Sequence, residues 1–163
     1  MTNKNMTILG IDPGIADTGY GIIKKTGDSF TFLDCGTIKT SAKNDLALRL
    51  QNLYTDISAI IKKHKPQQIG IEELFFAKNT KTAITVSHAR GVILLASRKA
   101  KCEIKEFTPL QIKQAITGYG KADKNQIQEM VKTILNLDSI PKPDDASDAL
   151  AIAICCGQTK YAK

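Results

Sequence analysis

Two carboxylates stand where an apolar strand ends and a turn begins, a position from which a side chain can do chemistry. Asp12 closes a strand at residues 7–12 and is followed directly by Pro13-Gly14, and Glu72 closes a second strand at residues 68–72. A single aspartate in such a place is commonly a turn cap, because its side chain bonds to the nearby backbone. A second carboxylate in the same position weakens that structural interpretation.

Two more carboxylates, Asp145 and Asp148, are three residues apart on a predicted helix and therefore lie on one helix face. The small residues Ala146 and Ala149 leave room around them. Acidic residues also stabilise a helix N-terminus through its dipole, which accounts for Asp145 and its neighbour Asp144 without any chemical role. The dipole accounts poorly for Asp148, which lies about one turn into the helix and is followed by apolar residues.

If these four carboxylates converge, their mutual repulsion in a partly dry site requires cations to compensate it. Mg²⁺ is a hard ion that prefers oxygen ligands. Two such ions, about 3.5–4 Å apart, can bind both the attacking and the leaving oxygen of a phosphodiester. On a basic protein the cluster would therefore indicate phosphodiester hydrolysis. The spacing in the sequence is compatible with convergence but does not establish it.

The elements that must position these residues follow a pattern that predicts an α/β fold. Turn residues at Pro13-Gly14 and Thr26-Gly27-Asp28 separate three short strands, which form an antiparallel meander. Helices and two further strands then alternate. The predicted strands cover residues 7–12, 19–24, 29–38, 68–72 and 104–107. We therefore predict a mixed five-stranded sheet flanked by helices.

Five helices are predicted from apolar residues at helical spacing and from capping residues. The second, at residues 80–101, contains Val92-Ile93-Leu94-Leu95, which is apolar on every side of a helix. We expect such a helix to be buried on two sides. The predicted helices begin at Asp45, Thr80, Thr108, Asp123 and near Asp144, the first ends before Pro66, and Gly157 is placed to end the last.

The composition indicates an ordinary globular protein. Its 163 residues fit one domain spanning residues 1–163, and 42% of them are hydrophobic and 24% charged. The longest apolar stretch, at residues 149–156, is far shorter than the roughly 18 residues that span a bilayer. The N-terminal residues lack the apolar centre of a signal peptide, so we expect a cytoplasmic protein.

The four cysteines do not have the spacing of a zinc site, and the chain has only two histidines. We expect Cys35, Cys102, Cys155 and Cys156 to be buried reduced thiols. The 23 Lys and Arg against 16 Asp and Glu give a formal net charge of +7. This excess favours a polyanionic partner, although moderately basic proteins that bind no nucleic acid are also common.

Taken together and in order, four motifs resemble the RuvC family of Holliday junction resolvases, whose fold is that of ribonuclease H. The resemblance runs from Thr7 to about Gly157, nearly the whole chain. Any one motif is weak, whereas the ordered set is specific. The motifs are Gly10-Ile11-Asp12-Pro13-Gly14 with Thr18-Gly19-Tyr20-Gly21; Ile71-Glu72-Glu73-Leu74-Phe75-Phe76-Ala77-Lys78-Asn79; Ala89-Arg90-Gly91; and Asp145-Ala146-Ser147-Asp148-Ala149-Leu150-Ala151-Ile152-Ala153.

The resemblance implies which residues carry the chemistry. The metal-binding catalytic carboxylates would be Asp12, Glu72, Asp145 and Asp148, with Glu73 and Asp144 as bystanders. The implied cofactor is Mg²⁺, two ions per active site, with Mn²⁺ as a substitute. The implied activity is that of a crossover junction endodeoxyribonuclease, which resolves four-way DNA junctions by paired nicks in recombination and repair and leaves 5′-phosphate and 3′-hydroxyl ends.

The resemblance also implies contacts and partners. Phe75 matches an aromatic residue that stacks on bases opened at the junction centre, although a place in the core is a serious alternative for it. Lys113 and Lys124 match lysines close to the DNA, and without the resemblance both would be interpreted as solvated surface residues. The helix after Asn79 resembles a dimer-forming helix, so a homodimer is implied. RuvA and RuvB branch-migration proteins are the implied protein partners.

Two other functions stay open. Residues 108–118 and 123–135 could form a helix-turn-helix around Gly118-Tyr119-Gly120 in a DNA-binding protein without catalysis, which would leave the four carboxylates unexplained. A ribonuclease H-like nuclease acting on another nucleic acid would share both the fold and the carboxylates.

Overall fold

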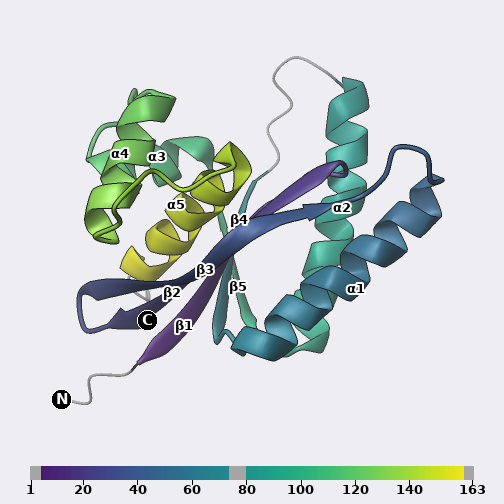
Figure 1. Ribbon diagram of the computed structural model, residues 1–163, viewed down its shortest axis with the longest axis horizontal. Helices are drawn as coiled ribbons and strands as arrows, with labels where there is room; N and C mark the ends of the chain where they lie inside the picture. Colours follow the sequence, from purple (N-terminus) through teal and green to yellow (C-terminus); the bar gives the residue numbers. More distant parts are fainter. Residues whose placement is uncertain (1–4, 74–79, 160–163) are drawn as a thin grey trace.

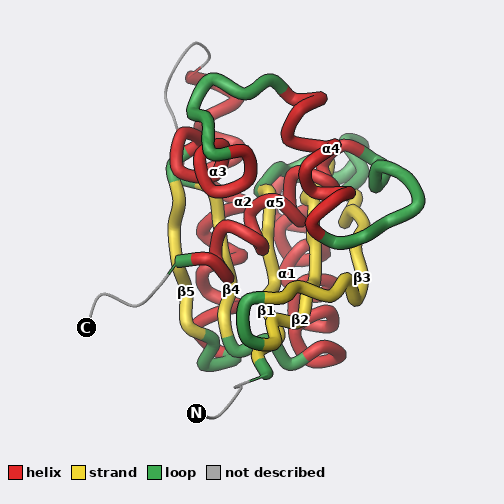
Figure 2. Tube along the Cα trace, turned by 90° about the vertical axis from the view of Figure 1, so that its left-hand side faces the viewer, coloured by secondary structure: helices red, strands yellow, loops and turns green. Residues whose placement is uncertain are grey.

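The middle of the molecule is a five-stranded sheet in the order β3-β2-β1-β4-β5, seen in a computed structural model that describes residues 5–73 and 80–159 (Figures 1 and 2). β1 pairs antiparallel with β2 and parallel with β4, which in turn pairs parallel with β5. The predicted mixed sheet is therefore confirmed. The strands are β1 (Met6–Asp12), β2 (Asp17–Thr26), β3 (Ser29–Lys39), β4 (Gln68–Glu72) and β5 (Glu103–Phe107).

Helices cover both faces of this sheet (Figure 1). On one face lie α1 (Leu46–His64) and α2 (Thr80–Lys99), and on the other lie α3 (Pro109–Thr117), α4 (Lys124–Ile134) and α5 (Asp144–Gln158). Side chains alternate along β1, so Ile8 enters the apolar cluster with α5, whereas Leu9 and Ile11 enter the cluster with α1 and α2. Asp12, an even step from Ile8, is thus directed to the α5 face.

Capping residues fix where three of the helices begin. The side chains of Asp45, Thr108 and Asp123 each accept a hydrogen bond from a backbone N–H in the first turn of α1, α3 and α4. The prediction that Gly157 ends the last helix is wrong, because α5 continues to Gln158. Gly157 is buried inside the helix, where an added Cβ would overlap the ring of Phe30. Its missing side chain serves packing rather than helix termination.

One side of α2 packs on the sheet and α1, and the other is open. Ile93 is fully buried, whereas Ile84 and Leu95 are 58% and 57% exposed. The helix was predicted to be buried on two sides, and within this single chain it is buried on one side only. Cys102, Cys155 and Cys156 are buried free thiols as expected, but Cys35 is partly exposed because it lies on the edge strand β3. Among the described residues, no helix has the length and apolar character needed to cross a membrane.

Candidate active site

Two neighbouring parallel strands bring Asp12 and Glu72 to the same edge of the sheet. Ile11 of β1 pairs with Ile71 of β4, so the carboxylates that follow them end side by side. The backbone N–H of Glu73 donates to Phe107 O at 2.8 Å and continues the sheet past Glu72. In the turn after Asp12, the buried Thr18 Oγ1 donates to Gly14 O at 2.5 Å. Both carboxylates are therefore held by fixed backbone.

A row of glycines lets α5 lie almost directly on the sheet. Gly10 pairs with Gly21 of β2 on one side and with Gly70 of β4 on the other. A Cβ on Gly10 would overlap the carbonyl oxygen of Ala149, and one on Gly19 would overlap that of Asp145. This close approach needs glycine on the strand. As a result, the first turns of α5 lie over the end of β1.

The structure gathers three of the four predicted carboxylates into one cluster. Asp12, Asp145 and Asp148 each offer one oxygen, and these oxygens lie within 4.8 Å of one another on side chains that are partly exposed. Glu72 is outside this tightest group. It lines a hollow of about 180 Å³ together with Asp148 and Lys113. The arrangement is therefore a cluster of three with a fourth carboxylate beside Asp148.

The electrostatics of this cluster are unfavourable without a cation. Burial, added to repulsion from Asp148, Glu72 and Asp145, raises the pKa of Asp12 from 3.8 to about 8. Burial is also the main cause that raises the pKa of Glu72 and that of Asp148. Such groups take up protons or bind metal to relieve their repulsion. An all-oxygen donor set of this kind fits Mg²⁺ or Mn²⁺ rather than a softer metal.

Two lysines border the carboxylates. Lys124 Nζ lies 3.1 Å from Asp144 Oδ2 and 3.8 Å from Asp148 Oδ2. Lys113 lines the hollow that holds Glu72, and its charge opposes the rise in the pKa of Glu72. Phe75, predicted to stack on DNA bases, lies outside the described residues. Lys124 begins α4, so the start of the second helix of the possible helix-turn-helix is part of the carboxylate site.

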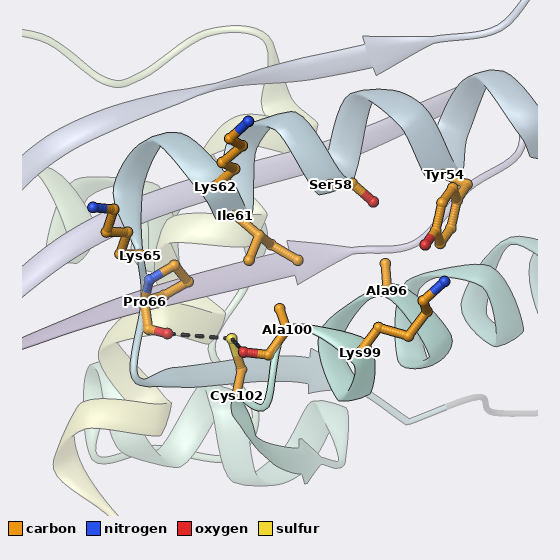
Figure 3. Close-up of a pocket in the computed structure, with 10 residues that line it drawn as sticks. All are labelled: Tyr54, Ser58, Ile61, Lys62, Lys65, Pro66, Ala96, Lys99, Ala100 and Cys102. Carbon is orange, nitrogen blue, oxygen red and sulfur yellow. Dashed lines mark hydrogen bonds between the residues drawn. The ribbon is translucent and has the colours of Figure 1, made fainter.

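A larger hollow exists at a distance from these groups. It has a volume of about 580 Å³ and lies between α1 and α2 (Figure 3). Its ten lining residues include Lys62, Lys65 and Lys99 but no carboxylate, and the Cys102 thiol at its wall donates to Pro66 O at 3.2 Å. Size alone would favour this hollow as the binding site. The carboxylate cluster is the stronger candidate for the active site, because that is where groups able to bind a metal converge.

Sequence reasoning misses two parts of the site. The glycine row is visible as Gly10, Gly21 and Gly70 within strand motifs, but only the strand register shows that the three are neighbours. Asp144, a bystander by the family resemblance, accepts hydrogen bonds from Lys142, Lys124 and Gln128. These partners, Lys142 most strongly, lower the pKa of Asp144 to about 2.

The sheet order, the helices on both faces and the carboxylates at the shared ends of β1 and β4 define the ribonuclease H-like class. Solved structures agree. The Thermus thermophilus RuvC structure has a TM-score of 0.85 at 32% identity and covers 92% of each chain. T. thermophilus RuvC in complex with Holliday junction substrate has a TM-score of 0.83 at 30% identity and covers 92% of this chain and 91% of that one.

The family follows from the sequence comparison. Residues 8–156 match the family described as Crossover junction endodeoxyribonuclease RuvC. The RuvC of Caldicellulosiruptor saccharolyticus is 57% identical over 151 residues, 92% of this chain and 91% of the relative. The RuvC of Halothermothrix orenii is 54% identical over 154 residues, which are 94% of this chain and 93% of that relative. This chain belongs to the RuvC family of crossover junction endodeoxyribonucleases.

Proposed function

We propose that this protein is a structure-selective endonuclease that resolves four-way DNA junctions by paired symmetric nicks in recombination and repair. The observation that supports this best is the cluster of Asp12, Asp145 and Asp148, whose oxygens lie within 4.8 Å of one another in a chain of net charge +7. Carboxylates so close need cations, and a basic chain attracts a polyanion. Membership of the family, and the T. thermophilus relative solved in complex with Holliday junction substrate, support the choice of substrate.

In this proposal the protein's residues divide into metal ligands and phosphate contacts. Asp12, Asp145 and Asp148 would hold Mg²⁺ or Mn²⁺, and Glu72 would add a fourth oxygen donor from the neighbouring strand. Bound divalent cations would neutralise the cluster, polarise the phosphodiester and activate an attacking water. Cleavage on the 3′-oxygen side of the phosphate would leave 5′-phosphate and 3′-hydroxyl ends.

Lysines at the border of the site would bring the DNA backbone to it. Lys113 lines the hollow with Glu72, and Lys124 contacts Asp148, so both ammonium groups are directed to the carboxylate edge. There they would bind phosphates and stabilise the negative charge that develops during cleavage. By the family resemblance Phe75 would stack on bases opened at the junction centre.

Paired nicks require two sites, and we propose that a homodimer supplies them. The open side of α2 exposes Ile84 and Leu95, and Gly91 between them has nothing within 4 Å of an added Cβ. An exposed apolar stripe with a small residue at its centre suits close packing against a second copy across a twofold axis. RuvA and RuvB branch-migration proteins as further partners rest on the family resemblance alone.

A panel of nucleic acids tests this function. Purified protein is incubated with a synthetic four-way junction, a linear duplex of the same sequence and an RNA–DNA hybrid, each with Mg²⁺, Mn²⁺ or chelator. We expect the junction to be bound selectively, because a dimer presents two clefts at a fixed separation, and to be cut only with metal. Hydrolysis of the hybrid with the junction uncut would favour the related nuclease. Duplex binding without cleavage would favour a DNA-binding module.

A further inference from the structure

Asp144 is at the centre of a polar network next to the carboxylate cluster. It accepts a hydrogen bond from Gln128 Nε2 at 3.1 Å, and its two oxygens lie 3.0 Å from Lys142 Nζ and 3.1 Å from Lys124 Nζ. Its neighbour Asp145 belongs to the cluster, whereas Asp144 does not. Three donors, two from α4 and one from the loop before α5, therefore converge on one carboxylate that lies outside the cluster of Asp12, Asp145 and Asp148.

The buried member of this network is Gln128. It is only 5% exposed, and it lies four residues after Lys124 on α4, so the two side chains share a helix face. A buried amide that donates to Asp144 fixes the direction of its carboxylate. The other oxygen of that carboxylate is then aimed at Lys124. Helix α4 thus supplies both the lysine and the group that orients the lysine's partner.

Lys124 needs such a partner because a second carboxylate, Asp148, competes with Asp144 for its ammonium group. Its Nζ also lies 3.8 Å from Asp148 Oδ2, and its side chain is 54% exposed on a flexible four-carbon stem. Divalent cations at the cluster would repel the ammonium group from Asp148. Asp144, outside the cluster and held by Gln128 and Lys142, would keep its oxygen directed at Lys124 when metal is present.

We infer that Asp144 is a positioning residue that holds the Lys124 ammonium group at the edge of the metal site, where the scissile phosphate would arrive. This inference rests on the proposed function. It also explains why two ion pairs, 3.1 and 3.0 Å long, are kept at a half-exposed position. Exposed ion pairs of this kind stabilise a fold very little.

The competing explanation is that Asp144 only stabilises the N-terminus of α5. It is the first residue of that helix, the preceding Pro143 makes no capping hydrogen bond, and an acidic residue there favours the helix dipole. Such a role would alter melting but would not depend on Lys124. A double-mutant cycle separates the two explanations.

The cycle compares Asp144→Asn, Lys124→Met and the double variant, with Asp138→Asn as a matched control on the loop before α5. Single-turnover junction cleavage is measured at saturating Mg²⁺, well below the melting temperature. We expect Asp144→Asn to lower the cleavage rate about tenfold, to change junction affinity in chelator less than about twofold, and to have no further effect once Lys124 is replaced. The same loss in both backgrounds, or no loss in the single variant, would overturn the inference.

A second measurement does not depend on metal or activity. Reductive ¹³C-methylation labels the lysines, and NMR spectra of the labelled protein are recorded. The Lys124 methyl signal is assigned by its absence in Lys124→Met. We expect Asp144→Asn to narrow this signal because the ammonium group is released, while Asp138→Asn leaves it unchanged. An unchanged signal in Asp144→Asn rejects the positioning role. If wild-type protein cuts no junction, the proposed function itself fails, whereas a normal wild type with additive variants removes only this inference.

Discussion

The surroundings of Asp12 disfavour its charged form, and this links the stability of the folded protein to pH and to metal binding. Its pKa is raised from 3.8 to about 8 by burial and by three neighbouring carboxylates. In the folded protein the carboxyl group keeps its proton to about pH 8, whereas in the unfolded chain it loses the proton near pH 4. Between these values the folded state binds more protons, so the free energy of unfolding falls as the pH rises.

Asp12→Asn should therefore stabilise the metal-free protein. The gain should be absent below pH 4 and largest above pH 8. The full shift of about four pKa units would correspond to nearly 6 kcal/mol at about 1.4 kcal/mol per unit. Because the side chain is partly exposed and solvent screens its repulsion, we expect roughly 2–4 kcal/mol. For a chain of this size that is about 5–10 °C in melting temperature. Circular dichroism melts in chelator at pH 5 and pH 8 measure it. A variant that melts below wild type at pH 8 would show that the carboxylate is not destabilising there.

Charge removal in the cluster should separate cleavage from binding. We expect Asp148→Asn to abolish junction cleavage, because its oxygen belongs to the cluster that we propose binds the metal, while affinity for the junction in chelator stays within a few-fold of wild type. The same holds for Glu72→Gln, Asp12→Asn and Asp145→Asn. Gel-shift and cleavage assays on one preparation give both quantities. Cleavage at the wild-type rate in any variant would remove that residue from the catalytic set.

At the scale of elements, the distance between α5 and the sheet decides whether the site exists. Gly10 touches α5 through its backbone, and a Cβ there would overlap Ala149 O and Ala153 N. Gly10→Ala should cost roughly 3 kcal/mol or more and displace the helix that carries Asp145 and Asp148. Chemical denaturation measures the loss.

Gly120→Ala is a matched control for this change. A Cβ at Gly120 would meet the end of the Leu110 side chain, which is 54% exposed and can move aside. We therefore expect it to cost less than about 1 kcal/mol and to leave cleavage intact. Equal stability of the two variants would mean that α5 does not depend on the glycine row.

The strands and helices could be predicted where local chemistry sets their limits. Asp45, Thr108 and Asp123 cap helices as expected, because capping involves neighbours in the chain. The role of Gly157 could not be predicted, because it depends on packing against Phe30, which is far away in the sequence. The contact between Gln128 and Asp144 could not be predicted either, because it joins two helices whose relative placement depends on the packing of the core.

At the scale of the whole molecule, the open side of α2 should decide the oligomeric state. Leu95→Glu places a charge on that side, and we expect it to convert a dimer into a monomer in sedimentation experiments at micromolar concentration. Leu33→Glu is the control, since Leu33 is also exposed but lies on β3. A Leu95→Glu variant that sediments as wild type would place the dimer contact elsewhere.

The measurement that tests the central claim most directly is to map nicks on a four-way junction. Each strand is end-labelled in turn and the junction is incubated with Mg²⁺ or with chelator. We predict two nicks at symmetric positions in strands of like polarity, only with metal, with 5′-phosphate ends that a ligase can seal. A junction that remains uncut with Mg²⁺ and Mn²⁺ across several core sequences, or that is cut equally in chelator, would contradict the account.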